Sequence, residues 1–265
     1  MSLQNYVFYW TSTGNSLALA RRLADDLGGA VLVNMAEYQN RAFTAEEADT
    51  AAFVFPVHAW GSPIMVNRFL DNLKMDKPRY AFALIHSAGT PGDSYHIFSQ
   101  YLGKNGLTCD AAFEMLMPSN YLIFHNPPVG QELADILASA DERYADILRA
   151  VQNRESVFPP SDEARKKLSL TYPEYLAHAQ DMAADFFTNE KCVGCGICAE
   201  ACPTDNIEQD EEGKPVWRRD KCTHCLICLH WCPFAAIELT EKTRPLNRYH
   251  HPDITINDIY LNNGG

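Results

Sequence analysis

The stretch KCVGCGICAEACP occupies residues 191–203, and KCTHCLICLHWCP occupies residues 221–233. The second stretch repeats the first at an offset of 30 residues, with four cysteines and a proline at matching positions. The offset also holds for Ile207 and Ile237. Of the nine cysteines in the 265-residue chain, only Cys109 lies outside this region. A repeat of this kind indicates one supersecondary unit that is used twice.

The cysteine spacing fits a cubane [4Fe–4S] cluster, which needs one thiolate on each of four irons. A tight loop with a cysteine at every third residue can hold three corners, and the fourth ligand must come from farther away. In two-cluster ferredoxins, the fourth cysteine of each run binds the other cluster. One predicted cluster is therefore held by Cys192, Cys195, Cys198 and Cys232. The other is held by Cys222, Cys225, Cys228 and Cys202.

Structural zinc is the alternative interpretation of these cysteines. Zinc sites with four cysteine ligands usually use two separated Cys-x-x-Cys pairs rather than one run of four. His224 and His230 lie inside the second run, but all eight ligand positions are already cysteine, so neither is expected to bind iron. Cys109 lies in an apolar stretch and is expected to be a buried core thiol. Residues 188–240 thus resemble the bacterial two-cluster ferredoxins.

The chain before residue 160 alternates predicted strands and helices. Buried strands are expected at Tyr6–Trp10, Ala30–Asn34, Ala51–Pro56, Tyr80–Ser87 and Cys109–Pro118. Apolar residues at helical spacing predict helices at Ser16–Leu27, Ile64–Leu73, Asp93–Leu102 and Gln131–Val151. This alternation predicts an α/β fold with a parallel sheet and helices on both faces.

Ligands of such sheets bind beyond the carboxyl ends of the strands, at the switch in strand order. The first loop there, Thr11–Ser16, carries four hydroxyls, a glycine and an amide before a predicted helix. Its backbone N–H groups and hydroxyls can enclose a phosphate, which the helix dipole also favours. The loop has neither the lysine of a Walker A motif nor a GxGxxG pattern. A monophosphate held by neutral donors is therefore predicted.

This loop is similar to the FMN-phosphate loop of the flavodoxins, and the resemblance covers roughly residues 4–152. It implies a doubly wound five-stranded sheet of order 2-1-3-4-5. It also implies that Trp60 stacks on the isoalloxazine ring, that a backbone group near Gly61 bonds flavin N5, and that the loop from Ser87 contacts the pyrimidine end. The implied cofactor-binding residues are Thr11, Ser12, Thr13, Gly14, Asn15, Ser16, Pro56, Val57, His58, Ala59, Trp60, Gly61, Ser87, Ala88, Gly89, Gly92 and Asn120. His58 either approaches the flavin or fills the loop, and filling the loop is the favoured interpretation.

The resulting domain prediction has four parts. Residues 1–152 form a flavodoxin-like FMN-binding domain, and residues 153–188 form a linker with a helix at Leu176–Phe187. Residues 189–240 form a smaller α+β ferredoxin-like domain with two [4Fe–4S] clusters, and residues 241–265 form a tail that packs on the core. Two adjacent histidines in the tail, His250 and His251, leave metal binding open as an alternative.

Composition excludes several classes of protein. Hydrophobic residues make up 46% and charged residues 21%, which is ordinary for a globular chain and excludes disorder. The net charge of −12 repels phosphate backbones, so nucleic-acid binding is not expected. No apolar run is long enough to span a membrane, and the first residues lack the features of a signal peptide. We therefore expect a cytoplasmic protein.

Taken whole, the chain resembles the flavodoxin–ferredoxin fusion proteins of anaerobic bacteria and archaea. The resemblance implies a protein that passes electrons between two [4Fe–4S] clusters and FMN within one chain, in low-potential anaerobic metabolism. Its expected partners are other redox proteins, which the sequence does not identify. The alternatives are a flavoenzyme that reduces a small organic acceptor such as a quinone, and a sensor that carries the same cofactors. No catalytic residue is predicted, and the oligomeric state stays open.

Overall fold

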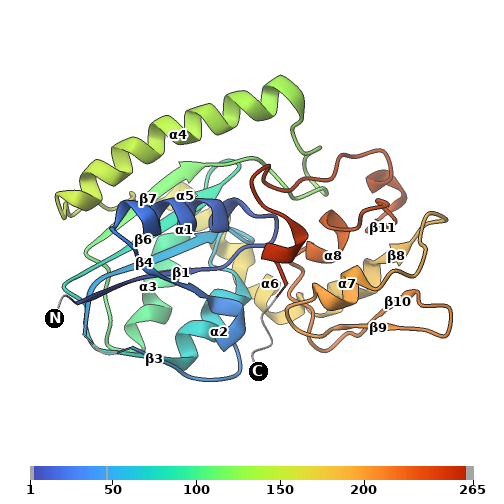
Figure 1. Ribbon diagram of the computed structural model, residues 1–265, viewed down its shortest axis with the longest axis horizontal. Coiled ribbons are helices and arrows are strands. Elements are labelled where there is room, and N and C mark those ends of the chain that lie inside the picture. Colours follow the sequence, from blue (N-terminus) through green and yellow to red (C-terminus); the bar gives the residue numbers. More distant parts are fainter. Residues whose placement is uncertain (1–2, 46, 261–265) are drawn as a thin grey trace. The chain divides into compact units, whose positions relative to one another are not determined.

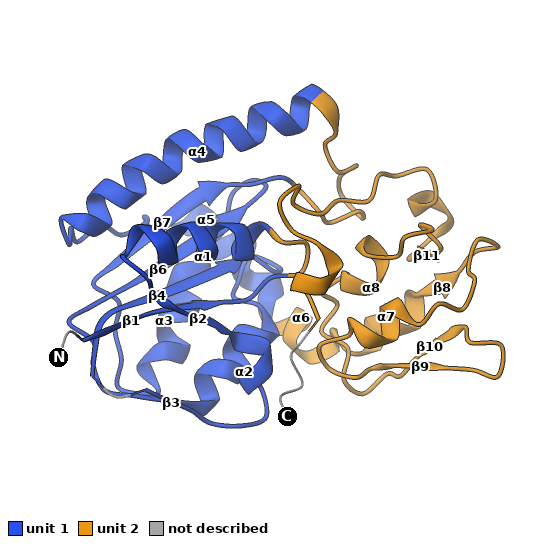
Figure 2. Ribbon diagram, in the orientation of Figure 1, with its two compact units in different colours: residues 1–11, 15–118, 131–172 blue, residues 12–14, 119–130, 173–265 orange. Residues whose placement is uncertain are grey.

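The computed structural model describes residues 3–45 and 47–260 (Figure 1). Its contacts divide the chain into two compact units, shown in blue and orange in Figure 2. Unit 1 contains Met1–Thr11, Asn15–Pro118 and Gln131–Tyr172, and unit 2 contains Ser12–Gly14, Ser119–Gly130 and Pro173–Gly265. In the described part of the chain, no helix is long and apolar enough to cross a membrane.

Unit 1 is built on a sheet of five strands. These are β1 (Gln4–Tyr9), β2 (Val31–Asn34), β4 (Ala48–Pro56), β6 (Tyr80–Ser87) and β7 (Ala111–Leu116). All neighbouring strands are parallel, and their order is β2-β1-β4-β6-β7. Counted along the chain, this is the order 2-1-3-4-5 of the flavodoxin-like folds. The predicted fold class is therefore confirmed.

Successive side chains of a strand point to opposite faces of a sheet. Both faces of this sheet carry apolar side chains, and helices cover both. On one face, Val7, Val54 and Leu84 share a buried cluster with residues of α1 (Asn15–Asp26) and α4 (Gly130–Gln152). On the other face, Phe8 lies 5.2 Å from Phe69 of α2 (Ile64–Asn72), between ring centroids. Phe53 of the same face lies 5.4 Å from Phe98 of α3 (Ser94–Gly103).

The rest of unit 1 consists of short elements. Strands β3 (Phe43–Ala45) and β5 (Leu73–Met75) form a separate parallel pair, which the sequence did not predict. A 3-10 helix, η1, spans Met35–Tyr38. After α4, the chain forms α5 (Glu163–Leu168), η2 (Ser169–Thr171) and the first residue of α6 (Tyr172–His178).

In unit 2, the two cysteine runs form the same local structure twice. Helix α7 (Ile197–Glu200) is followed by β9 (Ile207–Gln209), and α8 (Ile227–His230) is followed by β11 (Ile237–Glu238). These elements are offset by the same 30 residues as the cysteines. Strand β9 pairs antiparallel with β10 (Pro215–Trp217), and β11 pairs antiparallel with β8 (Phe187–Thr188). Two further 3-10 helices, η4 (Glu241–Thr243) and η5 (Ile256–Asp258), lie in the tail.

The helix predicted at Leu176–Phe187 is wrong. Helix α6 ends at His178, a short 3-10 helix, η3 (Asp181–Asp185), follows, and the chain is extended from Phe186. Phe186 is buried and stacks on Trp217, with 5.6 Å between ring centroids. Phe187 and Thr188 pair with β11. Burial of Phe186 and the strand pairing therefore override the local helical pattern.

Candidate functional site

The cysteines of unit 2 line two cavities. Cys192, Cys195, Cys198 and Cys232 line the first, which is called site I. Cys202, Cys222, Cys225 and Cys228 line the second, which is called site II. Each cavity thus combines three cysteines of one run with the last cysteine of the other run. Within the described residues, no three His, Cys, Asp or Glu side chains converge closely enough to hold a single metal ion.

The loops that carry the first three cysteines have the same backbone shape in both runs. Gly194 and Gly196 have φ angles of +69° and +80° in the first run. At the matching positions of the second run, His224 and Leu226 have φ angles of +51° and +64°. Left-handed backbone costs about 1–3 kcal/mol for a residue other than glycine. Both loops therefore adopt the same backbone conformation around their cavities, although left-handed φ angles are unfavourable for His224 and Leu226.

Backbone N–H groups donate to cysteine sulfur atoms in both sites. Asn206 N–H donates to Cys202 Sγ and Ala236 N–H donates to Cys232 Sγ, each at 3.3 Å. His224 N–H donates to Cys222 Sγ at 3.4 Å. Such hydrogen bonds favour a negatively charged sulfur, and they are among the features that set the potential of a cluster. The donor arrangement therefore fits thiolate ligands of an iron–sulfur cluster.

Burial raises the pKa of the Cys222 thiol to about 11 and that of Cys225 to about 12. In site I, burial raises the pKa of Cys198 to about 11. These thiols are protonated at neutral pH without a metal, so metal binding must release their protons. The two sites differ in exposure: Cys195 of site I is exposed, whereas Cys228 of site II is buried.

The two histidines of the second run are buried and make other contacts. His224 lies against the rings of Tyr121 and Phe186, and burial lowers its pKa to about 4. His230 Nδ1 accepts a hydrogen bond from Tyr249 N–H at 3.1 Å. Its Nε2 therefore carries the proton and donates to the Asn120 carbonyl at 2.6 Å. Burial lowers the pKa of His230 to about 3, so the ring is neutral.

The predicted phosphate loop is divided between the two units. In unit 1, Ser16 Oγ lies 2.8 Å from His86 Nε2, and Asn15 Nδ2 donates to Pro118 O at 3.3 Å. Helix α1 begins at Asn15 and has no acidic residue in its first turn, so no carboxylate of that turn offsets the positive end of the helix dipole. Gly14 has a φ angle of +100°, which explains glycine at that position.

In unit 2, three hydrogen bonds hold Ser12 and Thr13. Trp231 Nε1–H donates to Ser12 O at 2.8 Å, and Asn120 Nδ2–H donates to Thr13 Oγ1 at 2.8 Å. His251 N–H donates to Thr13 O at 2.7 Å. A Cβ atom on Gly14 would lie 2.9 Å from Ile254 Cβ. His250, the other histidine of the pair, stacks on Trp231 with ring centroids 4.6 Å apart.

The second predicted flavin loop is a tight turn. His58 and Gly61 exchange two backbone hydrogen bonds of 3.0 and 2.9 Å. The two residues between them, Ala59 and Trp60, have φ angles of +47° and +59°. Gly61 has no such strained φ angle, but a Cβ atom there would lie 2.3 Å from Tyr172 Cδ2. Glycine at position 61 is thus explained by the close approach of Tyr172.

The third loop meets the second within unit 1. Gly92, with a φ angle of +66°, approaches so closely that a Cβ atom there would lie 2.7 Å from Trp60 Cβ. Ser87 Oγ donates to Gly89 O at 2.6 Å, whereas Ala88 and Gly89 are exposed. The chain just before this turn is joined to β6, because Val57 N–H donates to His86 O at 2.9 Å. Pro56 ends β4, so all three loops start at carboxyl ends of neighbouring strands.

Sequence reasoning missed three residues of the predicted linker that hold these loops. Ser169 Oγ donates to Trp60 O at 2.7 Å and accepts from Asp93 N–H at 2.8 Å. Tyr172 donates its hydroxyl to Ser62 O and accepts from Asn67 Nδ2, both at 2.7 Å. Arg165 forms a two-pronged ion pair with Glu114 of β7, at 2.7 and 2.9 Å. No local signal marks these residues, because their partners are 51–110 residues away in the sequence.

Two buried donors in unit 1 have no hydrogen-bond partner: Trp10 Nε1, at the end of β1, and Ser94 Oγ, directly after the third loop. Buried donors without a partner are unusual in proteins. Unpartnered donors directly before the first loop and directly after the third fit a polar ligand that carries hydrogen-bond acceptors, such as FMN.

Comparison with known proteins gives one family match. Residues 191–236 match the 4Fe-4S dicluster domain. No curated protein matches the chain. The sheet order and this match together bear out the prediction of a flavodoxin-like fold joined to a segment similar to dicluster ferredoxins. The match also indicates an iron–sulfur redox role.

The solved structures that are similar to this chain include a short-chain flavodoxin associated with a bacterial microcompartment. It is 16% identical to this chain, with a TM-score of 0.32. That comparison covers 56% of this chain and 99% of the flavodoxin. Rubredoxin oxygen:oxidoreductase from Desulfovibrio gigas is 13% identical, with a TM-score of 0.33. That comparison covers 57% of this chain and 36% of the oxidoreductase.

Proposed function

We propose that this protein transfers electrons between two [4Fe–4S] clusters and FMN held in one chain. The observation that carries the proposal is the pairing of the cysteines. Each of two cavities is lined by three cysteines from one run and one from the other. This exchange of the fourth ligand is the arrangement that two-cluster ferredoxins use. A pair of independent zinc sites has no need of it.

On the iron–sulfur side, the chain supplies ligands, hydrogen bonds and cover. The eight cysteines of sites I and II would bind the irons. The N–H groups of Asn206 and Ala236 would stabilise negative charge on the two exchanged ligands. Apolar residues such as Ile207, Leu226 and Ile237 are buried around the cavities and would exclude water.

On the flavin side, the proposed phosphate ligands are the hydroxyls and backbone N–H groups of Thr11–Ser16. The Trp60 turn and the Ser87–Gly92 loop would hold the ring. Ser169 links them, because its hydroxyl bonds both Trp60 O and the N–H of Asp93 at the end of the third loop. Iron–sulfur clusters exchange single electrons and a flavin exchanges one or two, so a chain with both can connect one-electron and two-electron partners.

The test is the cofactor content of protein purified without oxygen. The proposal predicts about eight irons and eight sulfides per chain, with one FMN. Cys202→Ala should lose the cluster of site II, whereas Cys109→Ala, which changes a buried cysteine outside both sites, should keep every iron. Zinc in place of iron would contradict the proposal. Loss of the other cluster from Cys202→Ala would show that the ligand sets are wrong.

A further inference from the structure

The internal repeat extends beyond the cysteines to a pair of opposite charges. Glu208 pairs with Arg218, and Glu238 pairs with Arg248, again at an offset of 30 residues. Each glutamate lies six residues after the last cysteine of its run, Cys202 or Cys232. The environments of the pairs are opposite. The Glu208 and Arg218 side chains are 57% and 46% exposed, whereas those of Glu238 and Arg248 are 1% and 10% exposed.

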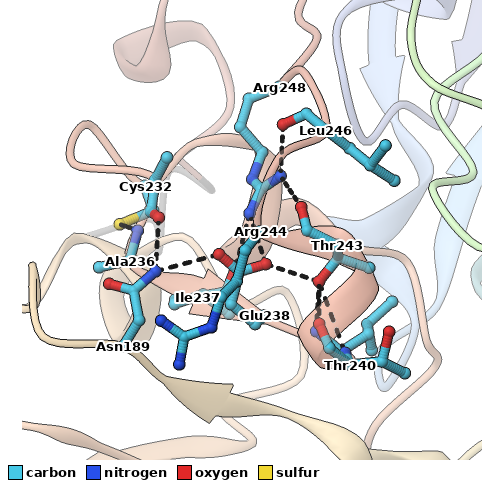
Figure 3. Close-up of polar contacts among 12 residues, drawn as sticks. Asn189, Cys232, Ala236, Ile237, Glu238, Thr240, Thr243, Arg244, Leu246 and Arg248 are labelled. Carbon is cyan, nitrogen blue, oxygen red and sulfur yellow. Dashed lines mark hydrogen bonds and ion pairs between the residues drawn. The ribbon is translucent and has the colours of Figure 1, made fainter.

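The buried pair is the centre of a hydrogen-bond network (Figure 3). Glu238 Oε2 accepts from Arg248 Nη2 at 2.8 Å and from Thr243 Oγ1 at 2.6 Å. Glu238 Oε1 accepts from Asn189 Nδ2 at 3.0 Å. Arg248 also donates to the carbonyl groups of Thr243, Leu246 and Ile237. A buried ion pair with this many hydrogen bonds is held in one geometry.

This network fixes the backbone beside an exchanged cysteine. Ala236 N–H donates to Cys232 Sγ at 3.3 Å. Neighbouring carbonyl groups accept from the network: Ala235 O, which precedes that N–H, accepts from Asn189 Nδ2 at 3.0 Å, and Ile237 O, one residue further along, accepts from Arg248 Nη2 at 3.0 Å. Asn189 N–H also donates to Ala236 O at 2.9 Å. In the first run, Asn206 N–H makes the matching bond to Cys202 Sγ, but its Glu–Arg pair lies in solvent.

We propose that Glu238 and Arg248 are positioning residues that set the reduction potential of the cluster in site I, and that Glu208 and Arg218 have no such role in site II. The inference rests on the proposed function. An N–H that donates to a ligand sulfur stabilises the additional negative charge of a reduced cluster. If the buried pair is removed, this N–H loses its fixed orientation, and the oxidised cluster is favoured.

The test compares two double variants that both leave the net charge unchanged. Glu238→Gln/Arg248→Met removes the buried pair, and Glu208→Gln/Arg218→Met removes the exposed pair. Potentials are measured by anaerobic titration of the whole protein, followed by electron paramagnetic resonance. The signal of site I is the one that survives Cys202→Ala. We expect the buried-pair variant to shift the equilibrium of site I about tenfold towards the oxidised form, or about 59 mV for one electron. The exposed-pair variant should shift neither site.

A second variant keeps the inference testable if the buried-pair variant fails to retain its clusters. Thr243→Val keeps the ion pair and removes the hydroxyl that donates to Glu238, which also accepts from the N–H groups of Leu239 and Thr240. It should shift site I in the same direction by a smaller factor. Unchanged potentials in the variants of the buried network would overturn the inference, as would an equal shift from the exposed pair. The proposed function fails separately, because unmodified protein would then contain no iron–sulfur clusters.

Discussion

Replacing Gly61 by alanine would place a methyl group inside the space that Tyr172 occupies. The new Cβ atom would lie 2.3 Å from Tyr172 Cδ2 and 2.4 Å from Cε2. Carbon atoms in contact are about 3.5–4.0 Å apart, so the ring or the turn must move by more than about 1 Å. The ring is anchored by its hydroxyl, which bonds Ser62 O and Asn67 Nδ2. Movement therefore also weakens these buried hydrogen bonds.

The expected cost follows from these two effects. Overpacking costs about 1–3 kcal/mol, and a weakened buried hydrogen bond adds about 1 kcal/mol. Gly61→Ala should therefore lower the free energy of unfolding by about 2–4 kcal/mol. For a unit of this size, that corresponds to a fall of roughly 4–16 °C in Tm. Thermal unfolding of the cofactor-free chain, followed by circular dichroism, measures it. FMN affinity should fall in the same variant, because the Trp60 turn is displaced.

Gly89→Ala is the matched control, because a Cβ atom there meets no atom within 4 Å and the φ angle is unstrained. It should leave Tm nearly unchanged. The Tyr172 ring is tested directly by repeating Gly61→Ala in a Tyr172→Ala background, where most of the cost should disappear. Equal losses from both glycine variants, or a full cost that remains without Tyr172, would refute the steric argument.

The remaining predictions concern single side chains. Ser16→Ala should weaken FMN by about 1.5–3 kcal/mol, the value of a hydrogen bond to a charged group, but riboflavin much less; equal losses in a flavin titration would exclude a phosphate contact. Burial raises the pKa of the Cys109 thiol well above its ordinary value, so this thiol stays protonated at pH 8. In cofactor-free protein, iodoacetamide should therefore modify Cys195 first, as mass spectrometry would show, and early modification of Cys109 would contradict its burial. Trp231→Phe should lower the free energy of unfolding by about 1–3 kcal/mol, because a buried carbonyl, Ser12 O, loses its donor; urea titration measures the loss, and an unchanged midpoint would show that this bond contributes nothing.

The cysteine pattern and the sheet were predictable because their signals are local. Three-residue cysteine spacing permits few ligands, and buried strands bounded by turn residues leave few sheet orders. The Glu238–Arg248 pair also had a sequence signal, since the 30-residue offset continues through Glu208 and Arg218. No sequence signal marks its burial, because the same two residue types are exposed in the first copy of the repeat and buried in the second.

The residues that hold the Trp60 turn could not be predicted, because their role depends on tertiary contacts. Ser169 and Tyr172 read as ordinary residues of a linker, and only the folded chain brings them to Trp60 and Gly61. The wrong helix at Leu176–Phe187 has a similar cause. Its apolar spacing is helical, but the burial of Phe186 and the pairing of β8 with β11 draw the chain into an extended form.

The central proposal, electron transfer between clusters and flavin in one chain, is tested most directly by the rate of flavin reduction. The clusters are reduced by a fast one-electron donor, and the flavin absorbance is then followed over a wide range of protein concentrations. The proposal predicts a rate that does not depend on concentration, and a slower rate in Cys195→Ala protein that still holds its FMN. A rate that rises linearly with concentration would show that electrons pass only between molecules, and would contradict the proposal.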